Sequence, residues 1–281
     1  MPRLLMIVLL LLIVHYSMAQ AENKSQYTLR NPTPHEFMRE MSTDRPDKTE
    51  SPYTVDAGHY QIEMSFIDYQ YDHDIPDDSQ HRQYALAIAP INMKAGLFHN
   101  MDIQLVLAPY TIQQTNGIDR NRNIGFGDIQ TRLKINVYGN DDGPSAMAVM
   151  PFLKFPTSTD NLGNDDVEGG IILPIAFQLP GNWNMGLMSE FDFKHNSNES
   201  GYHTEFINSL TLGHAIIGNL SGYVEFFSNT SMDKKAPWLA TVDTGLTYAL
   251  TSETQLDLGV NVGVTRSAPD LNPFCGLTVR Y

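Results

Sequence analysis

From residue 58 to the C-terminus, apolar and polar residues alternate along the chain with a period of two. In the clearest segment, 255–265, Leu256, Leu258 and Val260 alternate with Asp257 and Gly259. Successive side chains of a β-strand point to opposite faces, so this pattern indicates a strand with one apolar and one polar face. Twelve strands are predicted, at 59–71, 82–95, 101–113, 125–138, 145–155, 168–179, 184–195, 202–213, 220–230, 238–250, 255–265 and 273–281.

The predicted strands have the length and the two-faced pattern of strands that cross a membrane. Each contains 9–14 residues, and a tilted strand needs about 9–11 residues to cross a bilayer. Apolar side chains would then face lipid, and polar side chains would face a wet lumen. We therefore predict an all-β fold in which residues 58–281 form a transmembrane antiparallel β-barrel of about 12 strands.

The connections between these strands alternate in kind. Every second connection is long or charged, as at 72–81, 156–166 and 231–237, whereas 97–100, 180–182 and 251–253 are short. The connection 139–144 is an exception, because it is not short. Long outer loops and short periplasmic turns are typical of bacterial outer-membrane barrels. With an even number of strands, both chain ends are expected on the periplasmic side.

Residues 1–57 lack the strand pattern. Residues 1–19 are predicted to be a secretory signal peptide, with Arg3, an apolar core at 4–14 and small residues before a cleavage site after Ala19. Its apolar core is too short to span a membrane as a helix. Residues 20–57 are polar and irregular, with a short helix predicted at 35–41. The chain is therefore predicted to be exported.

Several stretches resemble one protein family. They are T-D-R-P-D-K-T-E-S-P-Y-T-V-D-A-G-H-Y-Q-I-E at 43–63, G-F-G-D-I-Q-T-R-L-K at 125–134, P-F-L-K-F-P-T at 151–157, V-E-G-G-I-I-L-P at 167–174 and L-D-L-G-V-N-V-G-V-T-R-S-A-P-D-L-N-P-F-C-G-L-T-V-R-Y at 256–281. The family is labelled MetA-pathway of phenol degradation, and the resemblance covers nearly all of the mature chain. It implies an outer-membrane transporter linked to the uptake of aromatic compounds. It brings no defined catalytic or binding residues with it.

Charged side chains on the polar faces are candidates for the lining of a pore. On a lipid-facing position, a Lys or Arg at mid-depth would cost about 2–4 kcal/mol, so these residues are expected in the lumen. They either set the selectivity of a pore or pair with one another and fill a small barrel. The candidates are Asp128, Arg132, Lys134, Glu190, Asp192, Lys194, Asp243, Asp257 and Arg280.

A dense group of mixed charges precedes the first strand. Asp44 and Arg45 precede Pro46, and Asp47, Lys48 and Glu50 lie between Pro46 and Pro52. One interpretation is a solvated periplasmic linker. The other is a plug inside the barrel, with its charges paired to lumen residues such as Arg132, Lys134 or Asp128. The prolines would lower the entropic cost of ordering such a plug.

Charge and motifs exclude several other functions. A formal net charge of -14 opposes binding to nucleic acid. The histidines are scattered without the spacing of a metal site, and the chain has no G-x-S-x-G motif. We therefore expect no cofactor, no metal and no enzymatic activity. A lipid hydrolase that uses the outward-facing His195 is kept as a remote alternative.

The sequence thus favours an outer-membrane channel for passive uptake of small, aromatic or hydrophobic molecules. A non-conducting structural or adhesion barrel is the alternative. The expected partners are outer-membrane lipid, lipopolysaccharide near the acidic loops, and the barrel-assembly machinery. That machinery is expected to recognise the outward-facing terminal aromatic Tyr281.

Overall fold

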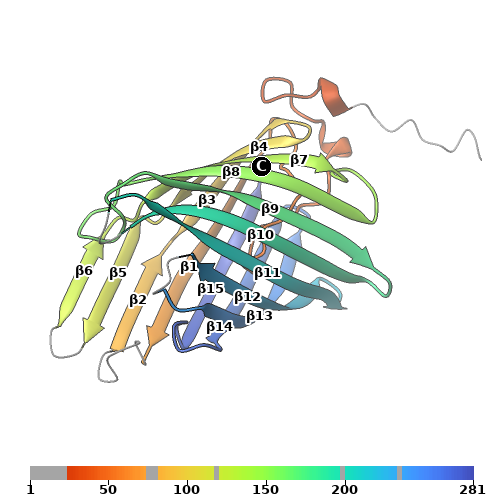
Figure 1. Cartoon of the computed structure of the whole chain (residues 1–281). Helices are drawn as coiled ribbons and strands as arrows, with labels where there is room; N and C mark the ends of the chain where they lie inside the picture. The colour runs from red at the N-terminus through yellow and green to blue at the C-terminus, as the bar shows by residue number, and fades with distance from the viewer. Residues whose placement is uncertain (1–23, 74–81, 117–119, 197–199, 233–235) are drawn as a thin grey trace, which may run out of the picture.

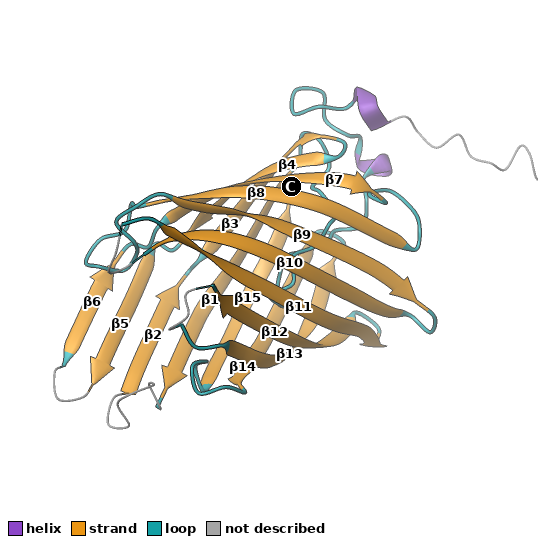
Figure 2. Cartoon of the chain, viewed as in Figure 1, coloured by secondary structure: helices purple, strands orange, loops and turns teal. Residues whose placement is uncertain are grey.

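The computed structural model describes residues 24–73, 82–116, 120–196, 200–232 and 236–281. The predicted signal peptide lies outside these residues. They form fifteen β-strands and two short 3-10 helices (Figures 1 and 2). No helix in this part of the chain is long and apolar enough to cross a membrane.

The helices, η1 and η2, span Lys24–Gln26 and His35–Phe37. The strands are β1 Tyr60–Asp72, β2 Arg82–Ile88, β3 Ile91–Phe98, β4 Met101–Leu107, β5 Tyr110–Asn116, β6 Asn121–Gly125, β7 Ile129–Tyr138, β8 Ser145–Phe155, β9 Glu168–Leu179, β10 Trp183–His195, β11 Tyr202–Ile217, β12 Leu220–Ser231, β13 Leu239–Thr251, β14 Thr254–Gly263 and β15 Leu271–Arg280.

Twelve of the strands close into a barrel. The series β1, β3, β4, β7 and then β8 to β15 is hydrogen-bonded in order, and β15 pairs back with β1. All of these pairings are antiparallel. The predicted antiparallel barrel of about 12 strands is therefore confirmed. We refer below to its short-turn end, which holds both Tyr60 and Tyr281, and to its long-loop end.

Two of the predicted strands are each divided in two, and a further strand, β6, lies mostly in the connection expected before the predicted strand 125–138. Ala89 and Pro90 separate β2 from β3, Ala108 and Pro109 separate β4 from β5, and residues 126–128 separate β6 from β7. Proline has no N–H to donate and interrupts a ladder, and Ala89 adopts a positive φ of 55°. The alternation is weak in 82–95, and the sequence pattern did not reveal any of the breaks.

Beyond these breaks, β2, β5 and β6 continue along β1 toward the long-loop end. The sheet order there is β1, β2, β5 and β6, and β6 is the last strand of the sheet. Figure 1 shows these strands projecting past the ends of β8 and β9. The barrel wall is therefore asymmetric at the long-loop end.

The side chains of the barrel strands alternate between an apolar outer face and a polar inner face. In β13, Val242 and Tyr248 are 41% and 46% exposed, whereas Asp243 between them is 0% exposed. The outer face therefore has the character expected of a lipid contact. The predicted facing of 240–250 matches this arrangement.

Adjacent residues of β13 provide a matched test of the facing. Leu246→Arg places a charge on the outer face, where it should cost about 2–4 kcal/mol at mid-depth. Thr247→Arg places the same charge on the inner face, opposite Asp257 of β14, and should assemble normally. Heat-modifiable migration on gels reports barrel assembly. Equal behaviour of the two variants would contradict the assigned faces.

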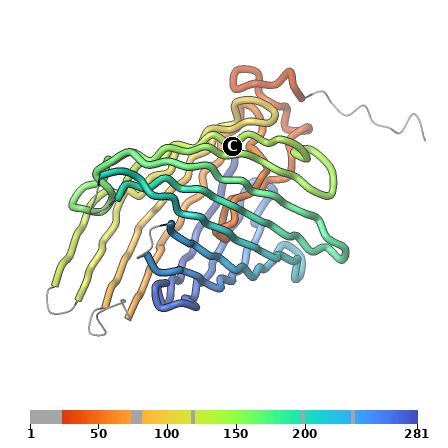
Figure 3. Tube along the Cα trace, viewed as in Figure 1, coloured from red at the N-terminus to blue at the C-terminus, as the bar shows by residue number. Residues whose placement is uncertain are grey.

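The N-terminal segment, residues 24–59, carries both short helices and otherwise has irregular structure. The helix predicted at 35–41 is wrong beyond its first turn, because η2 ends at Phe37 and Met38 is extended. Arg39 instead donates its backbone N–H to Asp56 and its guanidinium to the His99 carbonyl. These tertiary hydrogen bonds outweigh a weak helical propensity. From here the segment enters the barrel (Figure 3).

Candidate functional site

Residues 43–51, called here the lumen segment, lie inside the ring of strands. Their side chains form ion pairs with strands on different sides of the barrel, which a segment outside the ring could not reach. The pairs are Arg45–Asp257 on β14 at 2.6 Å, Lys48–Asp243 on β13 at 3.1 Å and Glu50–Arg132 on β7 at 2.5 Å. Asp47 lies beside Glu225 of β12.

Asp44 occupies the centre of a buried charge cluster. Its Oδ1 atom lies 2.7 Å from Lys134 Nζ, and its Oδ2 atom contacts Lys94 Nζ. Lys94 also pairs with Glu63, which accepts the backbone N–H of Asp44 at 3.1 Å. All four side chains are buried. A third buried carboxylate, Asp102 of β4, lies opposite Lys134 in the ladder, and Asp44 supplies the direct ion pair of that lysine.

Arg45 is held against β14 and β15 by charge and by shape. Its Nη2 and Nε atoms bind the two oxygens of Asp257 at 2.6 and 3.2 Å, the bidentate geometry that gives the strongest ion pairs. Its Nη1 atom donates to Ser65 at 2.6 Å. A Cβ atom on Gly276 would lie 2.4 Å from Nη2. The glycine therefore leaves the space that the guanidinium fills.

Glu225 of β12 binds the middle of the lumen segment through its backbone. Its two oxygens accept the N–H groups of Lys48 and Thr49 at 2.9 and 2.8 Å. The Thr49 hydroxyl also lies 2.6 Å from that of Ser209 on β11. Backbone contacts of this kind fix the path of a segment that has no regular structure of its own.

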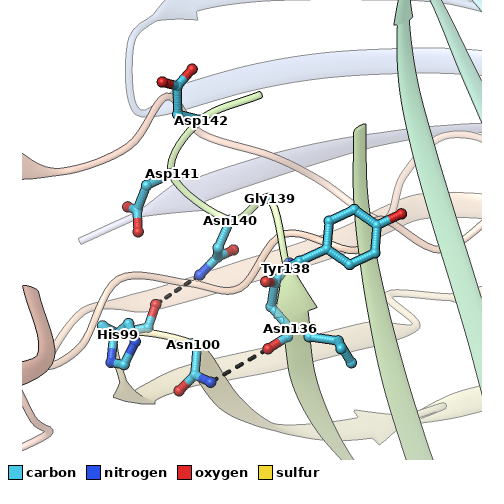
Figure 4. Close-up of a pocket in the computed structure, with 9 residues that line it drawn as sticks. His99, Asn100, Asn136, Tyr138, Gly139, Asn140, Asp141 and Asp142 are labelled. Atoms are coloured by element: carbon cyan, nitrogen blue, oxygen red, sulfur yellow. Dashed lines mark hydrogen bonds between the residues drawn. The ribbon is translucent and has the colours of Figure 1, made fainter. Parts of the chain in front are cut away.

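The turn between β7 and β8 anchors the N-terminal segment, residues 24–59, where this segment enters the barrel. There Asn140 accepts the N–H of Thr54 at 3.1 Å and donates to its hydroxyl and to the His99 carbonyl. Asp141 pairs with Lys24 at 2.7 Å. A shallow polar pocket of about 320 Å³ surrounds this turn (Figure 4). Among its lining groups, Asn140, Asp141 and the His99 carbonyl already bind the N-terminal segment.

Arg280 ties the same end of the segment to the last strand. Its guanidinium lies 3.5 Å from Asp56 and donates to Glu253 at 3.0 Å. Glu253 lies in the turn between β13 and β14, and the hydrogen bond from Arg280 lowers the pKa of its carboxyl below the usual value. The carboxylate therefore stays ionised to a lower pH than an ordinary glutamate does.

Eight of the nine predicted lumen residues are on the inner faces of strands. They are Arg132 and Lys134 on β7, Glu190, Asp192 and Lys194 on β10, Asp243 on β13, Asp257 on β14 and Arg280 on β15. The ninth, Asp128, lies in the bend before β7 and pairs with Lys154 at 3.3 Å. Toward the long-loop end, Lys194 pairs with Glu205 of β11 at 2.8 Å.

Sequence reasoning missed an apolar cluster that also faces inward. It is formed by Met150, Phe152, Ile172, Met188 and Ile207, with Phe227 packed against it. The backbone N–H of Glu50 contacts Met188 Sδ at 3.5 Å, so the cluster borders the lumen segment. The sequence pattern that could have indicated this cluster is in 145–155 and 168–179, where apolar residues occupy both faces of the predicted strands.

The candidate for hydrolytic chemistry is His195, at the long-loop end of β10. Its Nδ1 atom lies 3.1 Å from Asp166, and its ring meets the edge of Tyr202. Among the described residues, no group of three or more His, Cys, Asp or Glu side chains is arranged to hold a metal ion.

With this geometry in place, comparison with known proteins assigns the family. The model described as "Putative MetA-pathway of phenol degradation" matches residues 43–281. The chain belongs to this family. The resemblance seen in the motifs is therefore confirmed. The matched region begins at the first residue of the lumen segment, so the family model includes this segment together with the barrel.

A solved outer-membrane channel supports the barrel fold. The COG4313 outer membrane channel from Pseudomonas putida F1 aligns at a TM-score of 0.58 with 12% identity, covering 85% of this chain and 100% of that one. The CymD monoaromatic hydrocarbon channel aligns at 0.44 with 7% identity, covering 79% and 88%. The NanC porin aligns at 0.48 with 8% identity, covering 78% and 98%. Among curated proteins, none matches the sequence.

Proposed function

We propose that this protein is an outer-membrane channel for small hydrophobic molecules, with aromatic compounds as the main substrate class. The observation that carries the proposal is the apolar cluster on the inner wall. A structural barrel can fill its interior with paired charges alone. An apolar inner surface beside those charges suits a molecule that has a ring and few polar groups.

The family description agrees with this substrate class, because it refers to phenol degradation. Phenol carries an apolar ring and one hydroxyl. An aromatic ring has the chemistry to pack against Met150, Phe152 and Met188, because methionine sulfur makes favourable contacts with aromatic rings. The neighbouring carboxylates on β10, Glu190 and Asp192, can accept the hydroxyl proton in a hydrogen bond.

Uptake of radiolabelled phenol at low concentration tests the proposal. Cells that produce the protein should take up phenol faster than cells that produce the non-assembling Leu246→Arg variant. Met188→Gln should lower phenol uptake, because it places an amide in the apolar cluster, whereas uptake of glycerol should stay the same. Equal phenol uptake in the presence and absence of the assembled protein would overturn the proposal.

A non-conducting structural barrel is the second candidate. It is favoured by the ion pairs of Asp44, Arg45 and Glu50, which fill the lumen across its width. In a channel, removing the lumen segment would open a pathway through the barrel. In a structural barrel, the lumen would stay closed without it.

A further inference from the structure

The barrel wall has a seam beside β6. This strand pairs with β5 on one edge, and the sheet order gives it no strand on the other edge. Pairing between β7 and β8 begins only at Ile129 and Phe155. The wall between β6 and β8 is therefore not closed by a strand ladder at the long-loop end.

The loop 156–166 covers this seam. The Phe126 N–H donates to Thr159 Oγ1 at 2.9 Å, and the Thr159 N–H donates to the Phe126 carbonyl at 2.9 Å. Ile124 donates its N–H to Asp160 at 2.7 Å, and Ile129 donates to Thr157 Oγ1 at 2.9 Å. Three of these four bonds end on side chains of the loop. The closure is thus local, unlike the long paired strands elsewhere in the barrel.

Asp128 holds the loop in this position. Its carboxylate accepts the backbone N–H groups of Thr157, Ser158 and Asn164 at 3.1, 3.0 and 3.1 Å. A Cβ atom on Gly163 would lie 2.2 Å from Asp128 Oδ2, so this glycine allows the loop to press against the carboxylate. The position of the loop therefore depends largely on one side chain in the bend between β6 and β7.

Apolar surface lies on both sides of the seam. On the outer wall, Ile124 and Leu153 are 38% and 50% exposed. A shallow hollow of about 330 Å³ at the base of the loop is lined mainly by apolar side chains, among them Val167, Phe193 and Tyr202. Its floor includes Phe152, which also belongs to the apolar cluster on the inner wall.

The lumen segment lies between the seam and the short-turn end. Its Glu50 pairs with Arg132, three residues along β7 from Ile129, where the seam ends. A molecule that enters from the long-loop end therefore reaches the seam before it meets the buried ion pairs. An apolar molecule would have to pass those charges to continue along the axis, whereas the ion pairs at the seam itself are those of Lys154 with Asp128 and Glu168.

We infer that the loop 156–166 is a lateral gate, whose displacement from β6 lets an apolar molecule pass from the lumen into the outer leaflet of the membrane. This inference rests on the proposed function, because it requires that such molecules enter the lumen. It assigns Asp128 as the positioning residue of the gate. The outer hollow is the place where the leaving molecule meets lipid.

A disulfide across the seam tests the gate. The variant Phe126→Cys/Thr159→Cys, made with Cys275→Ser, joins two residues that already share a backbone hydrogen bond. The probe is N-phenyl-1-naphthylamine, an apolar dye that fluoresces in the acyl-chain region, added to intact cells. Oxidised protein should deliver the dye no faster than cells without the protein, and reduction should restore delivery. Heat-modifiable migration checks that the barrel has assembled.

A second variant keeps the test decisive if the cysteine pair does not assemble. Asp128→Asn weakens the hold on the loop and should speed dye delivery above that of the wild type. Equal delivery by the oxidised and reduced forms, or by Asp128→Asn and the wild type, would overturn the lateral gate. Phenol uptake measured in the same cells distinguishes failure of the lateral gate from failure of the proposed channel function. A channel with an axial exit still transports phenol when the gate is locked.

Discussion

Asp44→Ala should destabilise the barrel by about 3–5 kcal/mol, the usual cost of leaving buried charges without their partner. Asp44 is the shared partner of Lys94 and Lys134, and both lysines are buried on the inner wall. Glu63 can still neutralise Lys94. Lys134 would lose its direct ion pair and keep a weak contact with the Tyr53 carbonyl at 3.5 Å, with Asp102 opposite it on β4.

The measurement is the unfolding midpoint in urea, followed by heat-modifiable migration, with wild type and variant in the same detergent. Lys24→Ala serves as the control. It removes an ion pair with the exposed Asp141, and such pairs contribute about 0–1 kcal/mol. Asp44→Ala/Lys134→Met should recover part of the lost stability, because it removes the unpaired lysine. A midpoint for Asp44→Ala equal to that of the control would contradict the role given to the cluster.

The faces of the strands could be predicted because lipid and lumen impose opposite polarity on alternate residues. Val242 and Asp243 are neighbours in sequence, yet one is 41% exposed and the other is 0% exposed. A period of two in the sequence predicts this contrast between neighbouring residues. Closure of the ring followed from the number of such strands and from the alternation of long and short connections.

The breaks and the free edge of β6 could not be predicted in the same way. Pro90 and Pro109 stand at two of the breaks, but a proline in a run of alternating residues leaves the pattern intact. Asp128 has the parity of a lumen residue, and its actual role depends on the loop 156–166 folding back onto it. Contacts between a bend and a loop have no sequence period that would reveal them.

The charged residues of the lumen segment and two of their partners, Arg132 and Lys134, were recognisable from the sequence, whereas the individual pairings were not, and Asp128 pairs with Lys154 instead. The structure pairs Arg132 with Glu50 and Lys134 with Asp44. An irregular segment has no register against the strands, so several pairings satisfy the same charges. The choice among them depends on the path that Glu225 and Asn140 impose on its backbone.

Deleting residues 43–51 should open the lumen. The deletion removes a segment whose ion pairs reach β7, β13 and β14, and it leaves the outer face of the barrel unchanged. The charges left on the inner wall, among them Asp243 and Asp257, would then be hydrated by water that fills the vacated space. Because a wide aqueous path conducts ions and a filled one does not, the expected change is large.

Single-channel conductance in planar bilayers tests this most directly. Full-length protein should show a closed or very small conductance, and the 43–51 deletion should show a large, stable conductance. The Lys24→Ala protein should behave like the full-length protein, because its pair lies at the short-turn end, outside the ring. Equal conductance of the full-length and deleted proteins would contradict a lumen that is closed by its own N-terminal segment.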